Sequence, residues 1–231
     1  MLEISPADWE ALRLSLKVGF WSVAGSLPLG FALAYVFSRY TFPLKSVLNA
    51  IVHLPLVLPP VVTGFALLLL FGNRGPLGHL LSAVFGITIA FRWTGAAVAA
   101  AIMGLPLMVR AMRLSIDAVD RRLETAAWTL GASRWRTFRT ITLPLSLPGI
   151  IAGAILSFAK SFGEFGATIT FVSNIPGETR TVPIAIYSLL QSPGGETSAL
   201  YLAGISVLVS LAAILGAEMV ERRLSTRVHT V

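Results

Sequence analysis

Long apolar segments dominate this sequence, and a single long polar passage, residues 110–144, interrupts them. The segments on either side are long enough to cross a bilayer, which takes about 20 helical residues. Seven of the eighteen Lys and Arg residues lie in the passage: Arg110, Arg113, Arg121, Arg122, Arg134, Arg136 and Arg139. Basic loops between spans stay on the cytoplasmic side. The sequence therefore predicts an all-α, polytopic membrane protein with this passage in the cytoplasm.

Composition supports the same class of protein. Hydrophobic residues make up 55% of the 231 residues, charged residues only 13%, and the mean hydropathy is +0.78. The net charge of +7 comes from bases at the ends of spans, so nucleic-acid binding is not predicted. The absence of cysteine excludes disulfides and thiolate metal sites, and the three histidines are scattered. We expect no metal and no cofactor bound by this chain.

Five apolar stretches are expected to span the membrane: residues 14–37, 46–71, 95–109, 145–165 and 199–220. Ser5 or Asp8 is expected to cap the first helix, and the N-terminus lacks the features of a cleaved signal peptide. Two shorter pieces, residues 77–89 and 179–191, suggest re-entrant or interfacial helices, and the second could be a partial sixth span. With the N-terminus outside, twelve bases face the cytoplasm and five face outward, which predicts an N-out, C-in topology.

The second expected span contains three prolines, Pro55, Pro59 and Pro60, which should break the helix near mid-bilayer. Broken backbone at that depth has to be buried in protein or line a water-filled cavity. These prolines are therefore candidates for a transport pathway or gate. The alternative is a simple packing kink, with His53 hydrogen-bonded to a neighbour.

Two ionisable residues, Lys160 and Glu164, fall at membrane depth in the fourth expected span. Their spacing of four places them on one helix face, and intramembrane charges suggest function. A structural ion pair is the alternative. A polar series follows them: Thr168, Thr170, Ser173 and Asn174. These groups could donate hydrogen bonds to an oxyanion, or could equally satisfy irregular backbone.

The polar passage has a helical pattern of its own. Its apolar residues lie on one helical face: Leu123, Ala126, Ala127 and Leu130. Gly131 then permits a sharp chain reversal, and Ser133 can cap a second helix. A short helix, a glycine corner and a second helix would suit docking into the groove of another protein. A solvated loop that only sets the topology is the alternative.

The pattern Thr125-Ala126-Ala127, three residues, Gly131, nine residues, Ile141, one residue and Leu143-Pro144 resembles the EAA loop of binding-protein-dependent ABC importer permeases. One departure is that Thr125 holds the usual Glu position and Glu124 precedes it, so no specific role for the carboxylate is implied. The resemblance implies docking on an ATP-binding subunit through Leu123, Glu124, Thr125, Ala126, Ala127, Leu130, Gly131, Ala132, Ser133 and Arg134.

The stretches HLPLVLPPVVTGF and GEFGATITFVSNIPGETRT extend the resemblance to permease subunits of molybdate importers. This implies one permease domain over residues 1–231 with the type I (MetI-like) importer fold. It also implies a homodimer in the cell membrane, two cytoplasmic ATP-binding subunits, and an external binding protein that delivers molybdate or tungstate. Sulfate-type permeases share the loop and remain an alternative.

No G-x-x-x-x-G-K-[ST] pattern occurs, so this chain is not expected to be the ATPase, and ATP-Mg would be used by the partner. A secondary transporter or channel is the rival class, because broken spans and buried charges would suit it. A membrane enzyme is disfavoured, since no catalytic motif is present. We predict no catalytic residue.

Overall fold

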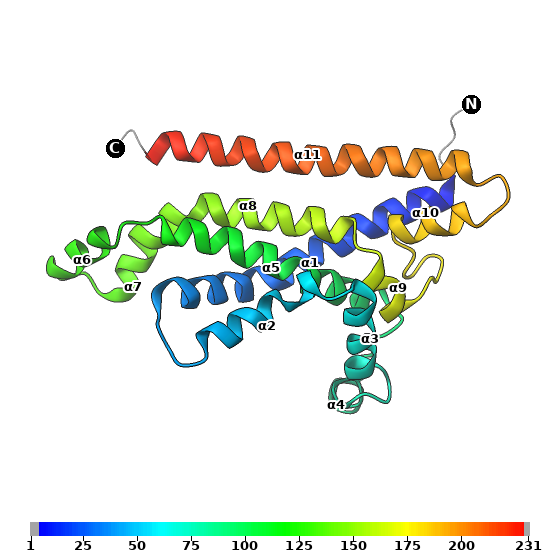
Figure 1. The fold of residues 1–231 in the computed structure, drawn as a ribbon, viewed down its shortest axis with the longest axis horizontal. Coiled ribbons are helices and arrows are strands. Elements are labelled where there is room, and N and C mark those ends of the chain that lie inside the picture. Colours follow the sequence, from blue (N-terminus) through cyan, green and yellow to red (C-terminus); the bar gives the residue numbers. More distant parts are fainter. Residues whose placement is uncertain (1–4, 229–231) are drawn as a thin grey trace.

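The computed structural model describes residues 5–228, and these residues are all-helical with no strand among them (Figure 1). The helices in chain order are α1 (Pro6–Arg39), α2 (Lys45–Val57), α3 (Pro60–Phe71), α4 (Pro76–Phe85), α5 (Trp93–Asp117), α6 (Arg121–Thr129), α7 (Arg134–Thr137), a π-helical turn (Phe138–Thr142), α8 (Leu143–Phe162), α9 (Gly166–Val172), α10 (Val182–Leu190) and α11 (Glu196–Val228). The all-α prediction is confirmed.

Four helical runs of the described chain are long and apolar enough to cross a membrane: α1, α5, Arg134–Phe162 and Glu196–Gly216. The pair α2 and α3 passes the same test together as one bent span, which makes five. With 10 and 9 residues, α4 and α10 are too short to span, as expected for the two short apolar pieces. Hence α10 does not form a sixth span.

The centre of the bundle is formed by α1, α5 and α8, which run side by side (Figure 1). Small residues allow close approach: a Cβ on Gly153 of α8 would lie 3.0 Å from the Met108 carbonyl oxygen of α5. Toward the end of α1, Phe37 packs with Met112 and Ile116 in a fully buried apolar cluster. This packing fixes where the ends of α1 and α5 lie.

Both helices that flank the polar passage differ in length from the prediction. The helix α5 continues past residue 109 to Asp117, because its polar end has partners: Ser38 donates a 2.5 Å hydrogen bond to Asp117 Oδ1, and Arg113 pairs with Asp117 at 3.5 Å. At the other side, α8 ends at Phe162 instead of residue 165, since Gly163 terminates it. The first part of the polar passage is thus a continuation of α5.

At the start of α1, both candidate capping residues take part. The Asp8 N–H donates to Ser5 Oγ at 3.2 Å, and the Ser5 N–H donates to Asp8 Oδ2 at 3.1 Å. This reciprocal arrangement is a capping box, with Ser5 as the N-cap.

The second span is broken, as its prolines predicted, with a bend of 114° between α2 and α3. The break lies at Leu58 and Pro59, directly before Pro60 begins α3. The expectation for Pro55 was wrong, because it lies inside α2 without ending it. His53 Nδ1 lies 2.8 Å from the Asn49 carbonyl oxygen within the same helix. Beyond the break, α3 packs on α9, and α4 lies at the far end of α3, away from the centre of the bundle (Figure 1).

Candidate functional site

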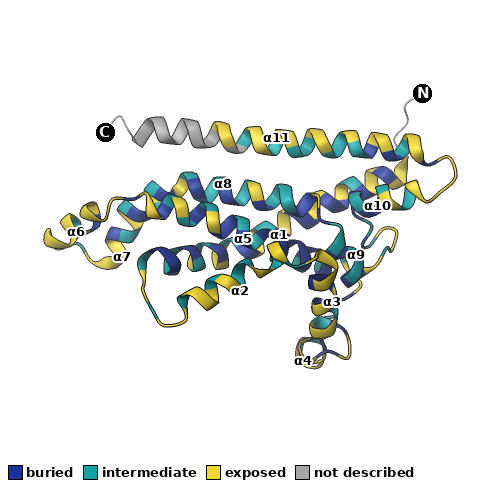
Figure 2. Cartoon of the chain, viewed as in Figure 1, coloured by how far each residue is buried: buried dark blue, intermediate teal, exposed yellow. Residues whose placement is uncertain are grey.

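One short helical segment projects from the end of the bundle where α1 and α5 finish (Figure 1). We call α6, α7 and the turn between them the α6–α7 segment, residues 121–137. Large apolar side chains lie on its surface: Leu130 is 88% exposed, Trp135 66% and Leu123 48%. Figure 2 shows the exposed residues on this projection. Exposed apolar residues on a segment with many charged neighbours make it a candidate interaction surface.

The backbone of the α6–α7 segment follows the predicted helix, corner and helix. Asp120 caps α6 by accepting a 2.9 Å hydrogen bond from the Arg122 N–H. Gly131 has a φ of +84°, the left-handed region that favours glycine, and no atom lies within 4 Å of a Cβ placed there. Ser133 caps α7 through the Arg136 N–H at 3.3 Å. Local hydrogen bonds and the glycine therefore determine the shape of the corner, and the space around Gly131 is free of other residues.

The carboxylate that departs from the EAA pattern has a structural role. Glu124 is buried; its Oε1 accepts a 2.5 Å hydrogen bond from Thr142 Oγ1 and lies 3.1 Å from Arg39 Nη2. The side chains of Arg39 and Glu124 are each only 9% exposed. Since Arg39 ends α1 and Thr142 ends the π-helical turn, one carboxylate ties α6 to both.

A second contact, made by Arg121, also fixes α6 to the long helices. Arg121 Nη2 donates a 3.0 Å hydrogen bond to the Ser38 carbonyl oxygen, and the Ser38 hydroxyl donates to Asp117. The first turn of α6 is thereby fixed to the ends of α1 and α5. A displacement of the α6–α7 segment would be transmitted directly to these long helices.

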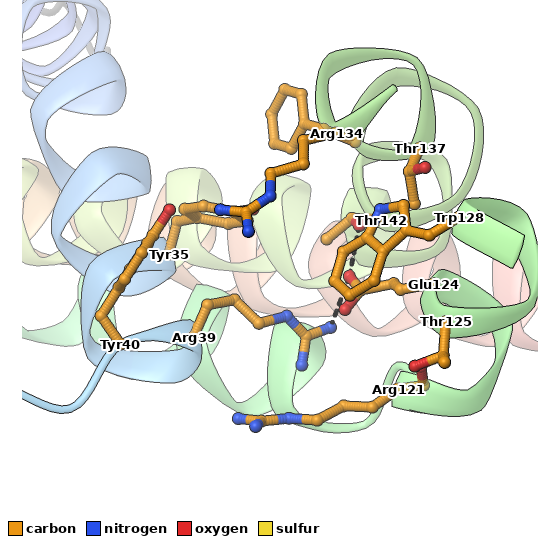
Figure 3. Close-up of a pocket in the computed structure, with 11 residues that line it drawn as sticks. Tyr35, Arg39, Tyr40, Arg121, Glu124, Thr125, Trp128, Arg134, Thr137 and Thr142 are labelled. Atoms are coloured by element: carbon orange, nitrogen blue, oxygen red, sulfur yellow. Dashed lines mark hydrogen bonds and ion pairs between the residues drawn. The ribbon is translucent and has the colours of Figure 1, made fainter. Parts of the chain in front are cut away.

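Beneath the segment lies a cavity of about 380 Å³ between the end of α1 and the helices α6 and α7 (Figure 3). It is lined by Tyr35, Arg39, Tyr40, Arg121, Glu124, Thr125, Trp128, Arg134, Thr137, Phe138 and Thr142. Sequence reasoning missed Arg39 and Trp128 as members of a site. The spacing of four residues between Glu124 and Trp128 could have placed both on one face of α6. No such local spacing connects Arg39 with Glu124, because the two are far apart in the chain.

The predicted contact between Lys160 and Glu164 is present, with Nζ and Oε2 3.0 Å apart. The two residues do not share a continuous helix, because α8 has ended when the chain reaches Glu164. The other oxygen, Oε1, accepts a 3.0 Å hydrogen bond from the Ala167 N–H in the first turn of α9. The Glu164 side chain is 2% exposed and that of Lys160 33%. Glu164 thus joins the end of α8 to the start of α9.

The proline break and this ion pair come together through close packing of α3 on α9. A Cβ on Gly64 would lie 2.5 Å from the Ala167 carbonyl oxygen, and one on Gly166 would lie 2.7 Å from Pro60 Cβ. We call this contact the α3–α9 junction. Thr168 lies at the junction, where its buried hydroxyl donates to the Glu164 carbonyl oxygen at 3.0 Å.

The remaining polar candidates lie at or beyond the other end of α9. Asn174 is fully engaged: its Nδ2 donates to Ser188 Oγ, and its Oδ1 accepts from Arg180 Nε, both at 2.8 Å. Ser173 is exposed at the end of the helix, with a φ of +64°. The Thr170 hydroxyl bonds the Gly166 carbonyl oxygen. Most of this series therefore satisfies backbone and neighbouring side chains, and the structure does not gather it into one site.

The fold and the projecting segment define a membrane subunit of a solute importer, and comparison with known proteins agrees. Residues 26–226 match the family described as "Binding-protein-dependent transport system inner membrane component", and the chain belongs to this family. The molybdenum transport system permease protein ModB of Escherichia coli K12 is 56% identical over 219 residues, 95% of this chain and 96% of the relative. Its Haemophilus influenzae counterpart is 49% identical over 217 residues, 94% and 95% of the two chains.

Solved structures agree on the fold. A bacterial alginate ABC transporter, crystallised with an alginate pentasaccharide-bound periplasmic protein, aligns with a TM-score of 0.74 at 20% identity. The alignment covers 95% of this chain and 80% of the other. The predicted importer permease fold is confirmed.

Proposed function

We propose that this chain is the membrane-spanning subunit of an ATP-driven importer that carries molybdate, or its close analogue tungstate, into the cytoplasm. The proposal of substrate rests on the two molybdenum permeases, which match nearly the whole chain at about half identity or more. The proposal of energy source rests on the α6–α7 segment. This chain carries no P-loop pattern, so the ATP and its magnesium would be bound by a separate subunit.

The observation that carries the proposal is the exposure of Leu123, Leu130 and Trp135 on a segment that is anchored from below. A short helix with an apolar face fits a groove of a partner, and the buried polar contacts keep that face fixed in orientation. We assign this surface to a cytoplasmic ATP-binding subunit. Two copies of the chain would present two such segments, one to each of two ATP-binding subunits.

Transport would follow an alternating-access scheme. ATP binding draws the two partner subunits together, and the α6–α7 segments move with them. Since Glu124 and Arg121 tie α6 to the end of α1, this movement would reorient the long helices and open the transport pathway outward, where a binding protein delivers its oxyanion. ATP drives this change if the whole complex binds ATP more tightly in one arrangement of the helices than in the other. The close-packed α3–α9 junction, with Lys160 beside it, is the proposed gate of the transport pathway.

This scheme requires the N-terminus outside and the C-terminus in the cytoplasm. That topology places the end of α1, the end of α5 and the α6–α7 segment on the cytoplasmic side together, as their contacts demand. It also agrees with the excess of Lys and Arg on that side.

The test is ATP hydrolysis and uptake by the full chain reconstituted in liposomes with a candidate ATP-binding subunit, a P-loop protein of the same organism. The arms are an external binding protein loaded with molybdate, tungstate or sulfate, and the empty binding protein. We expect the molybdate-loaded protein to stimulate hydrolysis and uptake, and the sulfate-loaded protein to leave both near the basal rate. Stimulation by sulfate alone would make this a sulfate-type permease, and uptake that proceeds without ATP would favour a secondary transporter or channel.

A further inference from the structure

Two residues that line the cavity under the α6–α7 segment also have buried donor atoms that lack acceptors. Arg39 Nε is buried without a hydrogen-bond partner within residues 5–228, although its Nη2 lies near Glu124. The hydroxyl of Thr137, which is 2% exposed, is also unpartnered there. Buried donors normally find acceptors, because an unsatisfied one destabilises the fold. Both residues line the cavity.

The charges around the cavity do not balance. Three guanidinium groups, those of Arg39, Arg121 and Arg134, lie along its wall, and Glu124 is the single carboxylate among the residues that line it. Figure 3 shows Arg39 reaching in from α1, whereas Arg121 and Arg134 reach in from the opposite side. The Arg134 guanidinium takes no part in the Arg39–Glu124, Arg113–Asp117 or Lys160–Glu164 ion pairs. An anion in this space would complete the charge balance.

The walls would strengthen such binding. Tyr35, Trp128 and Phe138 supply aromatic surface, and Tyr35 packs edge-on against Phe138 with ring centroids 5.4 Å apart. Apolar walls lower the local dielectric, and this strengthens contacts between guanidinium groups and an anion. The planar fork of arginine matches phosphate-like oxyanions, which can accept several hydrogen bonds at once.

We propose that this cavity binds a tetrahedral oxyanion, held by the guanidinium groups of Arg39 and Arg134. Two sources share this chemistry: the phosphate of an anionic phospholipid and a free oxyanion such as inorganic phosphate or molybdate. Arg39 is the last residue of a membrane-spanning helix, so the cavity lies at the depth of lipid headgroups, where basic pockets between helices bind such lipids. Its assignment to the cytoplasmic leaflet rests on the topology proposed above, but the binding itself does not.

A bound oxyanion would cross-link the end of α1 to α7, next to the tether made by Glu124. It would thereby set the stiffness of the connection between the α6–α7 segment and the membrane helices. Occupancy of the cavity is thus a means by which lipid composition, or the concentration of an oxyanion in the cytoplasm, regulates coupling.

The test uses the purified full chain without any partner, so its outcome is separate from that of the transport assay. In the first arm, the chain in phosphatidylcholine nanodiscs is dialysed against radiolabelled inorganic phosphate or molybdate. In the second arm, native mass spectrometry compares retention of phosphatidylglycerol with that of phosphatidylcholine. The variant is Arg134→Gln, because its exposed side chain makes no ion pair that folding needs. The matched control is Arg136→Gln, on the same helix but outside the cavity.

We expect saturable binding in at least one arm, weakened about tenfold by Arg134→Gln, as for the loss of one charged hydrogen bond. Arg136→Gln should leave it unchanged. Binding in the first arm alone identifies a free oxyanion, and binding in the second alone identifies the lipid. No binding in either arm, or binding that Arg134→Gln leaves intact, would overturn the proposal.

Discussion

Short helices follow long ones at both the α6–α7 segment and the α3–α9 junction. The two regions differ in how closely their residues are packed. The α6–α7 segment exposes its apolar residues, and around Gly131 it leaves open space. At the junction, Gly64 and Gly166 bring two helices into backbone contact, and no such space exists. The first leaves an apolar surface free for the partner proposed above, whereas the second packs two helices of this chain tightly together.

Each region also contains one buried carboxylate that pairs with a basic residue near a helix end. The two pairs differ in the burial of the base and in the distance along the chain between the partners. Glu124 pairs with Arg39, which is as buried as itself, across distant parts of the chain. Glu164 pairs with Lys160, four residues away, whose side chain is 33% exposed. The first pair therefore fixes tertiary structure, whereas the second leaves a cation accessible. Four substitutions separate these roles.

The largest effect is expected at the corner of the α6–α7 segment. Gly131→Pro cannot keep a φ of +84°, because the proline ring fixes φ near −65°. It also removes the hydrogen bond from the Gly131 N–H to the Trp128 carbonyl oxygen. We expect transport in the reconstituted system to be abolished, with the protein still inserted. Gly194→Pro is the control, since Gly194 has a φ of +77° in open space before α11. Equal loss in both variants would remove the special role of the segment.

The second-largest effect is expected at the ion pair between Glu124 and Arg39, which fixes α6 to the end of α1. Glu124→Gln leaves Arg39 buried without a counter-charge, and breaking a buried pair by removing one partner typically destabilises by about 3–5 kcal/mol. The free energy of unfolding of the purified protein in detergent measures this loss. The exposed Glu10→Gln should change it by less than about 0.5 kcal/mol. An unfolding free energy that Glu124→Gln leaves unchanged would show that α6 is held in another way.

A smaller loss is expected from crowding the α3–α9 junction. Gly64→Ala places a Cβ against the Ala167 carbonyl oxygen, and overpacking of this kind destabilises by about 1–3 kcal/mol. Gly25→Ala, within α1 and with no atom within 4 Å, should be neutral or stabilise by up to about 1 kcal/mol from helix propensity. The difference between the two unfolding free energies isolates packing. If Gly64→Ala were as stable as Gly25→Ala, the close contact of α3 and α9 would be refuted.

The smallest effect on stability is expected at the Lys160–Glu164 pair, in which the Lys160 side chain is partly exposed. Glu164→Gln keeps an oxygen for the Ala167 N–H but removes the attraction to Lys160, for a loss of about 1 kcal/mol. If Lys160 belongs to the pathway, molybdate uptake should fall by more than this loss of stability explains. A double-mutant cycle with Lys160→Gln separates the two contributions. Wild-type uptake in all three variants would leave the pair with a structural role only.

The features that sequence predicted correctly are those set by neighbouring residues. The apolar stretches give the spans, and Gly131 with Ser133 gives the corner and the cap of α7. The break before Pro60 follows from two consecutive prolines. Each depends on backbone chemistry within one or two helical turns, which a single sequence displays.

The features that could not be predicted from the sequence depend on contacts between residues that are far apart in the chain. The helix α5 reaches Asp117 because Ser38 on α1 stabilises that end. Glu124 has a function because Arg39, far away in sequence, lies beside it, so the motif alone gave its carboxylate no role. Pro55 stays within α2 although proline usually breaks helices, a tolerance common in membrane helices.

The most direct test of the central claim is a cross-linking measurement on the assembled complex. Because the chain has no cysteine, Leu130→Cys and Leu190→Cys each introduce a unique site for a photo-activated label. Leu130 lies on the α6–α7 segment, and Leu190, also exposed, ends α10 at the opposite end of the bundle (Figure 1). We predict a covalent adduct with the ATP-binding subunit from Leu130→Cys and none from Leu190→Cys. An active complex that gives no adduct from Leu130→Cys, or gives one only from Leu190→Cys, would contradict the account.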